Sequence, residues 1–239
     1  MKKIDLVKEN WSKEFRDVYV EDGNGQEGQV QHPIYGGRPT HCRSSLYTLT
    51  KILKPKSVLE IGSWNYQGSN YVAKALVELN LNSPVLSLDI RKGGYTGNEC
   101  YPKYECITAG FWYPHHTTTD VWKYDCSDLI CPEFKDLNDE EIFEKNLEIV
   151  NKWLSNKGLT GFDIVIIDGD HTTKGINFDW EYTKRFINQE GIVIVDDLYD
   201  SRHKMVRDYF DGIELEKYDW DDWNKEHPEY LISMGVIQL

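Results

Sequence analysis

The sequence contains no long apolar run. No stretch of its 239 residues approaches the roughly 20 consecutive apolar residues that a helix needs to cross a bilayer. The first residues, MKKIDLVKENWSKEF, also contain no apolar segment that could serve as a signal peptide. We therefore expect a cytoplasmic protein without a membrane-spanning segment.

Cysteine and positive charge are both scarce. The five cysteines are an odd number and include no CxxC pair, so neither a disulfide framework nor a zinc ribbon is expected. The 27 Lys and Arg residues are outnumbered by 40 Asp and Glu residues, and the net charge is −13. Because binding to nucleic acid or to an anionic membrane depends on a basic face, we expect no nucleic-acid and no membrane partner.

Short apolar runs alternate with amphipathic segments along most of the chain. This alternation is typical of an α/β protein with a doubly wound sheet, and two further apolar runs near the end predict a terminal antiparallel strand pair. Strands are expected at 57–62, 84–90, 121–125, 162–170 and 191–198, with the terminal pair at 212–218 and 230–239, and helices are expected at 44–52, 68–79, 139–157, 176–187 and 200–211.

One domain is expected, over residues 46–239, preceded by an N-terminal arm or lid at 1–45. The arm is rich in turn-forming residues and has too little apolar periodicity to predict a core element. Residues 91–120 lack a sustained helical period and are interpreted as an irregular insertion. The acidic, tryptophan-containing segment 219–230 is interpreted as a solvated loop.

A first group of candidate residues follows the first two predicted strands. In EIGSWNYQGS (60–69), the acid Glu60 precedes Gly62, which permits a sharp turn, and Gly68 opens the next helix. An acid here would repel a pyrophosphate, and no G-x-G-x-x-G motif is present, so the loop favours a zwitterionic amino-acid cofactor over a dinucleotide. Asp89 ends the second strand, where a carboxylate can accept hydrogen bonds from a ribose diol.

A second group of acids follows the fourth and fifth predicted strands. Asp168 and Asp170 lie in IIDGDH, while Asp196 and Asp197 lie in IVIVDDL. If the two strands are neighbours, these acids converge and repel one another unless a proton or a cation intervenes. A hard divalent ion such as Mg²⁺, Mn²⁺ or Ca²⁺ suits such oxygen ligands. The alternative is that the acids only cap the helices that follow.

These motifs resemble those of a known family. EIGSWNYQGS and SLDI resemble motif I and the acidic position after the second strand of class I S-adenosylmethionine-dependent methyltransferases, and the terminal strand pair resembles their seven-stranded, Rossmann-like sheet. Over about residues 45–200, DGDH and DD resemble the macrocin-type sugar O-methyltransferases and the cephalosporin-hydroxylase-like group, methyltransferase family 24. The resemblance implies S-adenosyl-L-methionine as cofactor, bound by Glu60, Gly62, Ser63, Gly68, Asp89, Asp125 (with Asp128 as the competing residue) and Asp168.

The resemblance also implies a metal centre and a general base. Asp168, Asp196 and Asp197 would be the metal ligands, with Mg²⁺ as the favoured ion. Asp170 would be the general base, and its neighbour His171 could share that role. Metal-free transfer by Asp170 or His171 alone is the alternative, because a positioned base contributes about 10²–10⁴-fold to a rate.

The predicted function is metal-assisted O-methylation of a hydroxylated small molecule or sugar. Two other interpretations remain open: a nucleotide-binding oxidoreductase or hydroxylase-like enzyme on the same fold, and an S-adenosylmethionine-binding protein without catalytic activity. The sequence identifies neither the acceptor nor the methylated atom, and it leaves assembly into a homo-oligomer open.

Overall fold

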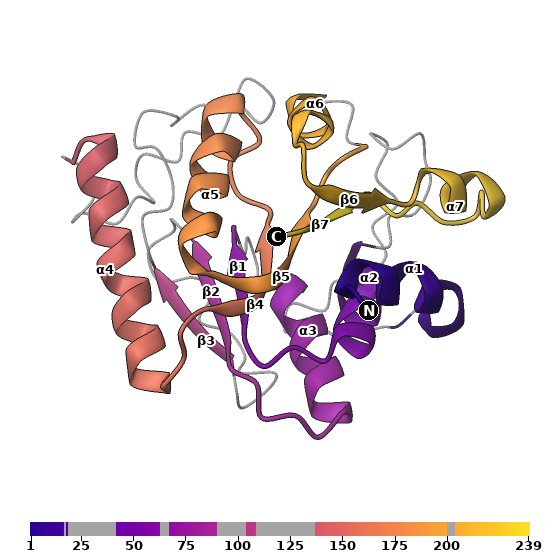
Figure 1. The fold of residues 1–239 in the computed structure, drawn as a ribbon, viewed down its shortest axis with the longest axis horizontal. Coiled ribbons are helices and arrows are strands. Elements are labelled where there is room, and N and C mark those ends of the chain that lie inside the picture. The colour runs from indigo at the N-terminus through magenta and orange to yellow at the C-terminus, as the bar shows by residue number, and fades with distance from the viewer. Residues whose placement is uncertain (17, 19–41, 63–66, 90–103, 109–136, 200–203) are drawn as a thin grey trace.

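A mixed β-sheet runs through the centre of the molecule, with helices on both faces (Figure 1). The two ends of the chain are in contact with each other. The backbone N–H of Ile4 donates a hydrogen bond to the side chain of Gln238 at 2.9 Å. The computed structural model describes residues 1–16, 18, 42–62, 67–89, 104–108, 137–199 and 204–239.

The described strands form one seven-stranded sheet in the order β3-β2-β1-β4-β5-β7-β6. The first five strands are parallel to their neighbours, and β7 is antiparallel to both β5 and β6. The strand order reverses between β1 and β4, which is the position at which doubly wound sheets bind ligands. The strands are β1 (Val58–Ile61), β2 (Val85–Asp89), β3 (Tyr104–Thr108), β4 (Phe162–Ile167), β5 (Ile187–Val195), β6 (Glu216–Asp219) and β7 (Gly235–Gln238).

Successive strand residues are buried in opposite layers of the molecule. Val58 and Ile164 pack with α1, α2 and α3, whereas Leu59 and Val165 pack with α4 and α5. Burial on both faces explains why the central strands are almost continuously apolar. The helices are α1 (Lys3–Glu14), α2 (Cys42–Leu53), α3 (Gln67–Glu78), α4 (Asp139–Lys157), α5 (Thr173–Phe186), α6 (Lys204–Gly212) and α7 (Asp221–Glu226).

This architecture confirms the predicted doubly wound α/β sheet with an antiparallel end. The helix predicted at 139–157 is α4, and its boundaries follow from local chemistry. Asn138 and Glu141 form a reciprocal capping box at its start, and Gly158 ends it with a left-handed φ of 67°. The predicted strands and helices between 162 and 211 are also present, with ends that differ by a few residues.

The prediction that residues 1–45 contain no core element is wrong for α1. Ile4, Val7 and Trp11 are at most 1% exposed and pack in the same cluster as strand residues of the sheet. Their spacing is helical, but three apolar residues among charged ones are a weak signal in a short window. Most of the predicted lid, residues 19–41, lies outside the described residues.

The third strand of the sheet is also not where it was predicted. It is formed by β3, inside the segment 91–120 that was interpreted as irregular, and it pairs in parallel with β2 from Tyr104 opposite Val85. A run of only five residues between segments rich in turn-forming residues is too short to show the alternation that identifies a strand. The predicted strand 121–125 lies outside the described residues.

The interpretation of 219–230 as a solvated loop is wrong as well. The segment contains α7, and Trp220 is fully buried while Trp223 is 9% exposed. The ring centroids of Trp11 and Trp220 are 4.5 Å apart. The acidic residues around these tryptophans suggested a surface loop. The tryptophans instead pack against α1, which lies at the other end of the chain, so their burial has no local sequence signal.

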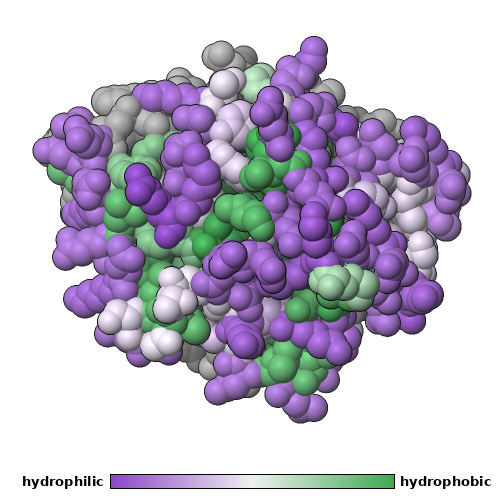
Figure 2. Space-filling model, in the orientation of Figure 1, coloured by the Kyte–Doolittle hydropathy of each residue, from purple (hydrophilic) through white to green (hydrophobic). Residues whose placement is uncertain are grey.

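The surface drawn in Figure 2 is mainly polar, with smaller, separate apolar areas. Large apolar side chains exposed within the described residues include Val77, Met205 and Leu215. None of the described helices combines the length and the apolar character required to span a membrane.

Candidate active site

The carboxyl ends of β1, β4 and β5 lie side by side at one edge of the sheet. Backbone hydrogen bonds continue just beyond the strands: Gly62, Asp168 and Asp196 each donate to a carbonyl of the neighbouring strand, at 2.9, 2.9 and 3.1 Å. The loops that carry the candidate residues therefore begin at the same place, as expected for parallel strands.

Gly62 allows the tips of β1 and β4 to approach each other closely. Its φ is +85°, and a Cβ atom at this position would lie only 2.0 Å from the backbone oxygen of Asp168. Both the left-handed conformation and the missing side chain are thus required here. The turn at Gly62 could be predicted from the sequence, but its close contact with the backbone of Asp168 arises only in the folded chain.

Glu60 is buried, and its carboxylate joins three elements. It accepts hydrogen bonds from the hydroxyl of Ser69 in α3 and from that of Ser87 in β2, the latter at 2.8 Å. A Cβ on Gly68 would lie 2.2 Å from Glu60 Oε1. Glu60 thus links β1 to β2 and to the first turn of α3.

The other predicted cofactor contacts are only partly described. Asp89 is the last residue of β2, at the same edge of the sheet as Gly62. Ser63 and Asp125 lie outside the described residues. The assignment of a cofactor to these residues therefore stays a prediction.

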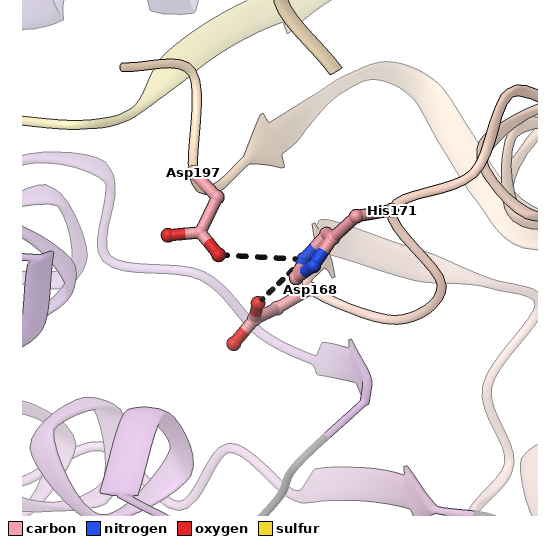
Figure 3. Close-up of side chains that lie close together, drawn as sticks. All are labelled: Asp168, His171 and Asp197. Carbon is pink, nitrogen blue, oxygen red and sulfur yellow. Dashed lines mark ion pairs between the residues drawn. The ribbon is translucent and has the colours of Figure 1, made fainter. Parts of the chain in front are cut away.

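Three side chains from two loops point toward one another beyond β4 and β5 (Figure 3). His171 Nε2 lies 3.4 Å from Asp168 Oδ1 and 3.4 Å from Asp197 Oδ2. One potential ligand atom from each residue falls within 4.8 Å of the other two. The side chains of Asp168, His171 and Asp197 keep 34%, 21% and 19% of their surface exposed, so this cluster can be reached from outside. We call these three residues the strand-tip cluster.

Burial and charge act against each other in the strand-tip cluster. Burial opposes a positive charge on His171, but the neighbouring carboxylates of Asp168, Asp197 and Asp196 outweigh it and raise the pKa of His171 to about 9. Burial also raises the pKa of Asp168 to about 6, although His171 and Arg43 favour its charged form. Between these values an imidazolium lies beside a carboxylate.

We expect this ion pair to make the stability of the metal-free protein depend on pH. Because the pKa of His171 is higher in the folded than in the unfolded state, its contribution is present below about pH 6.5 and is lost as the pH rises to about 9. The loss amounts to about 3 kcal/mol at most. Urea unfolding at several pH values, with chelator present, should show this decline in the wild type and a flatter profile in His171→Asn. Equal slopes in the two proteins would contradict the ion pair.

Asp196 lies beside the strand-tip cluster but is oriented differently. Burial first, and then the charges of Asp168 and Asp197, raise its pKa well above the ordinary value. Its Oδ1 accepts the backbone N–H of Asp197 at 2.7 Å, and it is also hydrogen-bonded to the thiol of Cys42. Asp197 itself has a left-handed φ of 60°. Two of the three predicted metal ligands thus meet in the cluster, with His171 in the third position.

Cys42 and Arg43, at the start of α2, are neighbours of this site, and both belong to the segment 1–45 that was predicted as an arm or lid. Burial, followed by the charges of Asp196 and Asp197, raises the pKa of the Cys42 thiol well above its usual range. Arg43 lowers the pKa of Asp168 through its charge. No motif marked these two residues, because α2 approaches the acids only in the folded chain.

Asp170, the predicted general base, is turned away from the strand-tip cluster. It is 5% exposed, and its two carboxylate oxygens accept the backbone N–H and the hydroxyl of Thr172, both at 2.9 Å. Thr172 in turn caps α5 by accepting the N–H of Gly175 at 3.1 Å. In this structure Asp170 shapes the turn before α5, and its catalytic role stays a prediction.

Asp179 in α5 is a further buried acid, and the sequence analysis missed it. It is 1% exposed, and burial, followed by the charge of Asp170, raises its pKa well above the ordinary value. A Cβ on Gly169 would lie 2.4 Å from Asp179 Oδ2, so the carboxyl group lies directly against the turn between Asp168 and His171. The sequence signal that could have identified Asp179 is its position on the apolar face of the helix, together with Ile176 and Tyr182.

Asparagine should replace Asp179 with little loss of stability. Burial disfavours the charged form of Asp179, and asparagine has nearly the same size without the charge, so we expect Asp179→Asn to change the free energy of unfolding by less than about 1 kcal/mol at pH 7. Asp179→Ala removes the acceptor of the Asp170 backbone N–H and should cost about 1–3 kcal/mol. Urea unfolding measures both changes, with the exposed Asp208→Asn as control. Equal losses in the two Asp179 variants would show that an acceptor oxygen at this position does not stabilise the protein.

The doubly wound sheet, the glycine turn after β1 and the acids after β4 and β5 together define the class I methyltransferase fold. A family model described as "Methyltransferase domain" matches residues 59–198. The match covers more than half of the chain, and the protein belongs to this methyltransferase family. No curated protein matches the sequence.

Solved structures with similar folds are distant in sequence. An O-methyltransferase from Bacillus cereus in complex with SAH is 11% identical, with 99% of this chain and 90% of that chain covered and a TM-score of 0.46. The O-methyltransferase TomG from Streptomyces achromogenes, in complex with SAM, is 10% identical, with 99% and 88% covered and a TM-score of 0.47. The MycE methyltransferase, in complex with Mg, SAH and mycinamycin VI, is 19% identical over 60% of this chain and 30% of that chain, with a TM-score of 0.36.

Proposed function

We propose that this protein is an S-adenosylmethionine-dependent O-methyltransferase that uses a divalent cation and acts on a hydroxylated small molecule or sugar. The observation that carries the proposal is the strand-tip cluster, which lies beyond β4 and β5 at the edge of the sheet where the β1–α3 turn begins. Membership of a methyltransferase family supports the transfer of a methyl group. The methyl donor and the acceptor would then bind at neighbouring positions along this edge.

The residues of the strand-tip cluster fit a divalent cation. Their oxygen and nitrogen atoms are close together, and the side chains are partly exposed and rich in negative charge, which a cation offsets. Asp168 and Asp197 would hold it. A cation at this position would supply Lewis acidity, which lowers the pKa of an acceptor hydroxyl.

The methyl donor would lie along the edge formed by β1 and β2. The turn at Gly62 would take the methionine portion, and Asp89 the ribose. In the reaction the acceptor oxygen forms a bond to the methyl carbon, the bond from that carbon to sulfur breaks, and its electron pair stays on the sulfur as a thioether. The hydroxyl proton leaves to a base or to water. Of the two predicted proton acceptors, His171 belongs to the strand-tip cluster, whereas the carboxylate of Asp170 is hydrogen-bonded to Thr172.

Two measurements test the proposal. Calorimetric titration should detect binding of S-adenosylhomocysteine and no binding of NAD or NADP; a preference for NAD would overturn the methyltransferase assignment. Transfer of a labelled methyl group to a panel of sugars and hydroxylated aromatic compounds should stop with EDTA and return with a divalent cation. Methyl transfer that continues with EDTA would reject the role of the cation but not the methyl transfer itself.

A further inference from the structure

We propose that His171 is itself a ligand of the cation, so that the centre has two carboxylates and one imidazole and prefers Mn²⁺ or Co²⁺ to Mg²⁺. The inference rests on the proposed function for the presence of a cation. It departs from the ligand set predicted from the sequence, in which Asp168, Asp196 and Asp197 were the ligands and His171 only a possible base.

The spacing of the donor atoms is the first argument. His171 Nε2 is 3.4 Å from an oxygen of Asp168 and equally far from an oxygen of Asp197. Hydrogen bonds between charged groups are shorter, about 2.7–2.9 Å. Donors that each lie about 2.0–2.2 Å from one cation are themselves roughly 3.0–3.6 Å apart. The observed separation, which is that of an ion pair in the metal-free protein, is therefore also one that donors sharing a cation adopt.

The direction and burial of the imidazole are the second argument. Figure 3 shows its ring edge turned toward the carboxylates of Asp168 and Asp197. The Nε2 atom is buried, although all three side chains remain partly exposed. These three side chains would supply three ligands and leave the other coordination positions of a cation to water or an acceptor hydroxyl.

The neighbouring acids are engaged elsewhere, which is the third argument. Asp196 accepts the Asp197 backbone N–H and bonds to the Cys42 thiol. Both oxygens of Asp170 accept hydrogen bonds from Thr172. Asp168, His171 and Asp197 are the described residues whose donor atoms remain gathered at one point.

A nitrogen ligand changes which metal is preferred. Mg²⁺ favours a shell of oxygen ligands and keeps several of its waters, whereas the affinity of first-row transition metals for a site with nitrogen rises from Mn²⁺ to Co²⁺. Removing the nitrogen should therefore weaken binding of Co²⁺ most, of Mn²⁺ less and of Mg²⁺ least. We expect a loss of at least about tenfold for Co²⁺ in His171→Asn and a change of less than about threefold for Mg²⁺.

The experiment uses metal-free full-length protein and measures binding directly. Co²⁺ is followed by its visible absorption, Mn²⁺ by electron paramagnetic resonance, and Mg²⁺ by competition against Mn²⁺. The proteins are the wild type, His171→Asn and the matched control His227→Asn, whose histidine lies far along the chain beside Glu229. Melting curves establish that each variant is folded.

A weaker Co²⁺ affinity and an altered Co²⁺ spectrum in His171→Asn, with neither change in His227→Asn, would support the ligand role. Unchanged affinity and spectrum in His171→Asn would overturn it, even if methyl transfer is lost, because His171 would then act as a base on a centre held by the aspartates. Absence of Co²⁺ and Mn²⁺ binding in the wild type would also overturn it. The methyl-transfer and S-adenosylhomocysteine measurements decide separately whether the proposed function itself fails.

Discussion

Replacing Gly62 with alanine is expected to destabilise the protein by about 3–5 kcal/mol, a large part of the stability of an ordinary domain. Two effects add. Alanine is strained at a φ of +85°, and its Cβ would lie 2.0 Å from the backbone oxygen of Asp168. Left-handed strain costs about 1–3 kcal/mol and overpacking a similar amount. The clash involves two backbones in adjacent strands, so no side chain can move to relieve it. Urea unfolding followed by circular dichroism measures the loss.

Gly158→Ala is the matched control for Gly62→Ala. Gly158 also has a left-handed φ, +67°, but nothing lies within 4 Å of the position of a Cβ atom. Gly158→Ala should therefore reduce the free energy of unfolding only by the backbone strain, about 1 kcal/mol. Similar losses in the two variants would show that the close approach of β1 and β4 is not the reason for a glycine at position 62.

Asp168→Asn is expected to reduce methyl transfer at least about hundredfold while the protein stays folded. The substitution removes one of the two carboxylates of the strand-tip cluster, and with it much of the attraction for a cation that would activate the hydroxyl. The protein should stay folded, because the ion pair of Asp168 with His171 contributes at most about 3 kcal/mol and burial opposes the charge of Asp168. The measurements are kcat/KM with an acceptor found by screening, the melting temperature and the affinity for S-adenosylhomocysteine.

The control for Asp168→Asn is Asp208→Asn, which changes an exposed acid of α6. It should leave all three quantities unchanged. Wild-type turnover in Asp168→Asn would reject the role of this carboxylate in the reaction. A loss of S-adenosylhomocysteine affinity would instead assign Asp168 to the cofactor, the other role predicted for it.

Most helices and central strands could be predicted from the sequence because their signals are local. A buried parallel strand such as β4 is apolar at almost every position, and α4 has both a capping box and a terminal glycine. The missed elements, α1, β3 and α7, contain many polar residues and few apolar ones in a periodic pattern. Their formation depends on partners far away in the chain, as the contact of Trp11 with Trp220 illustrates.

The acids after β4 and β5 and the glycine turn after β1 could be identified from the sequence, because strand ends and turns have local sequence signals. Which of the acids meet depends on the tertiary structure. Asp168 and Asp197 join His171, whereas Asp170 bonds to Thr172 and Asp196 to the backbone of Asp197. The direction of each side chain depends on the backbone angles of its turn, such as the left-handed Asp197, and on the packing of α2 and α5 against those turns.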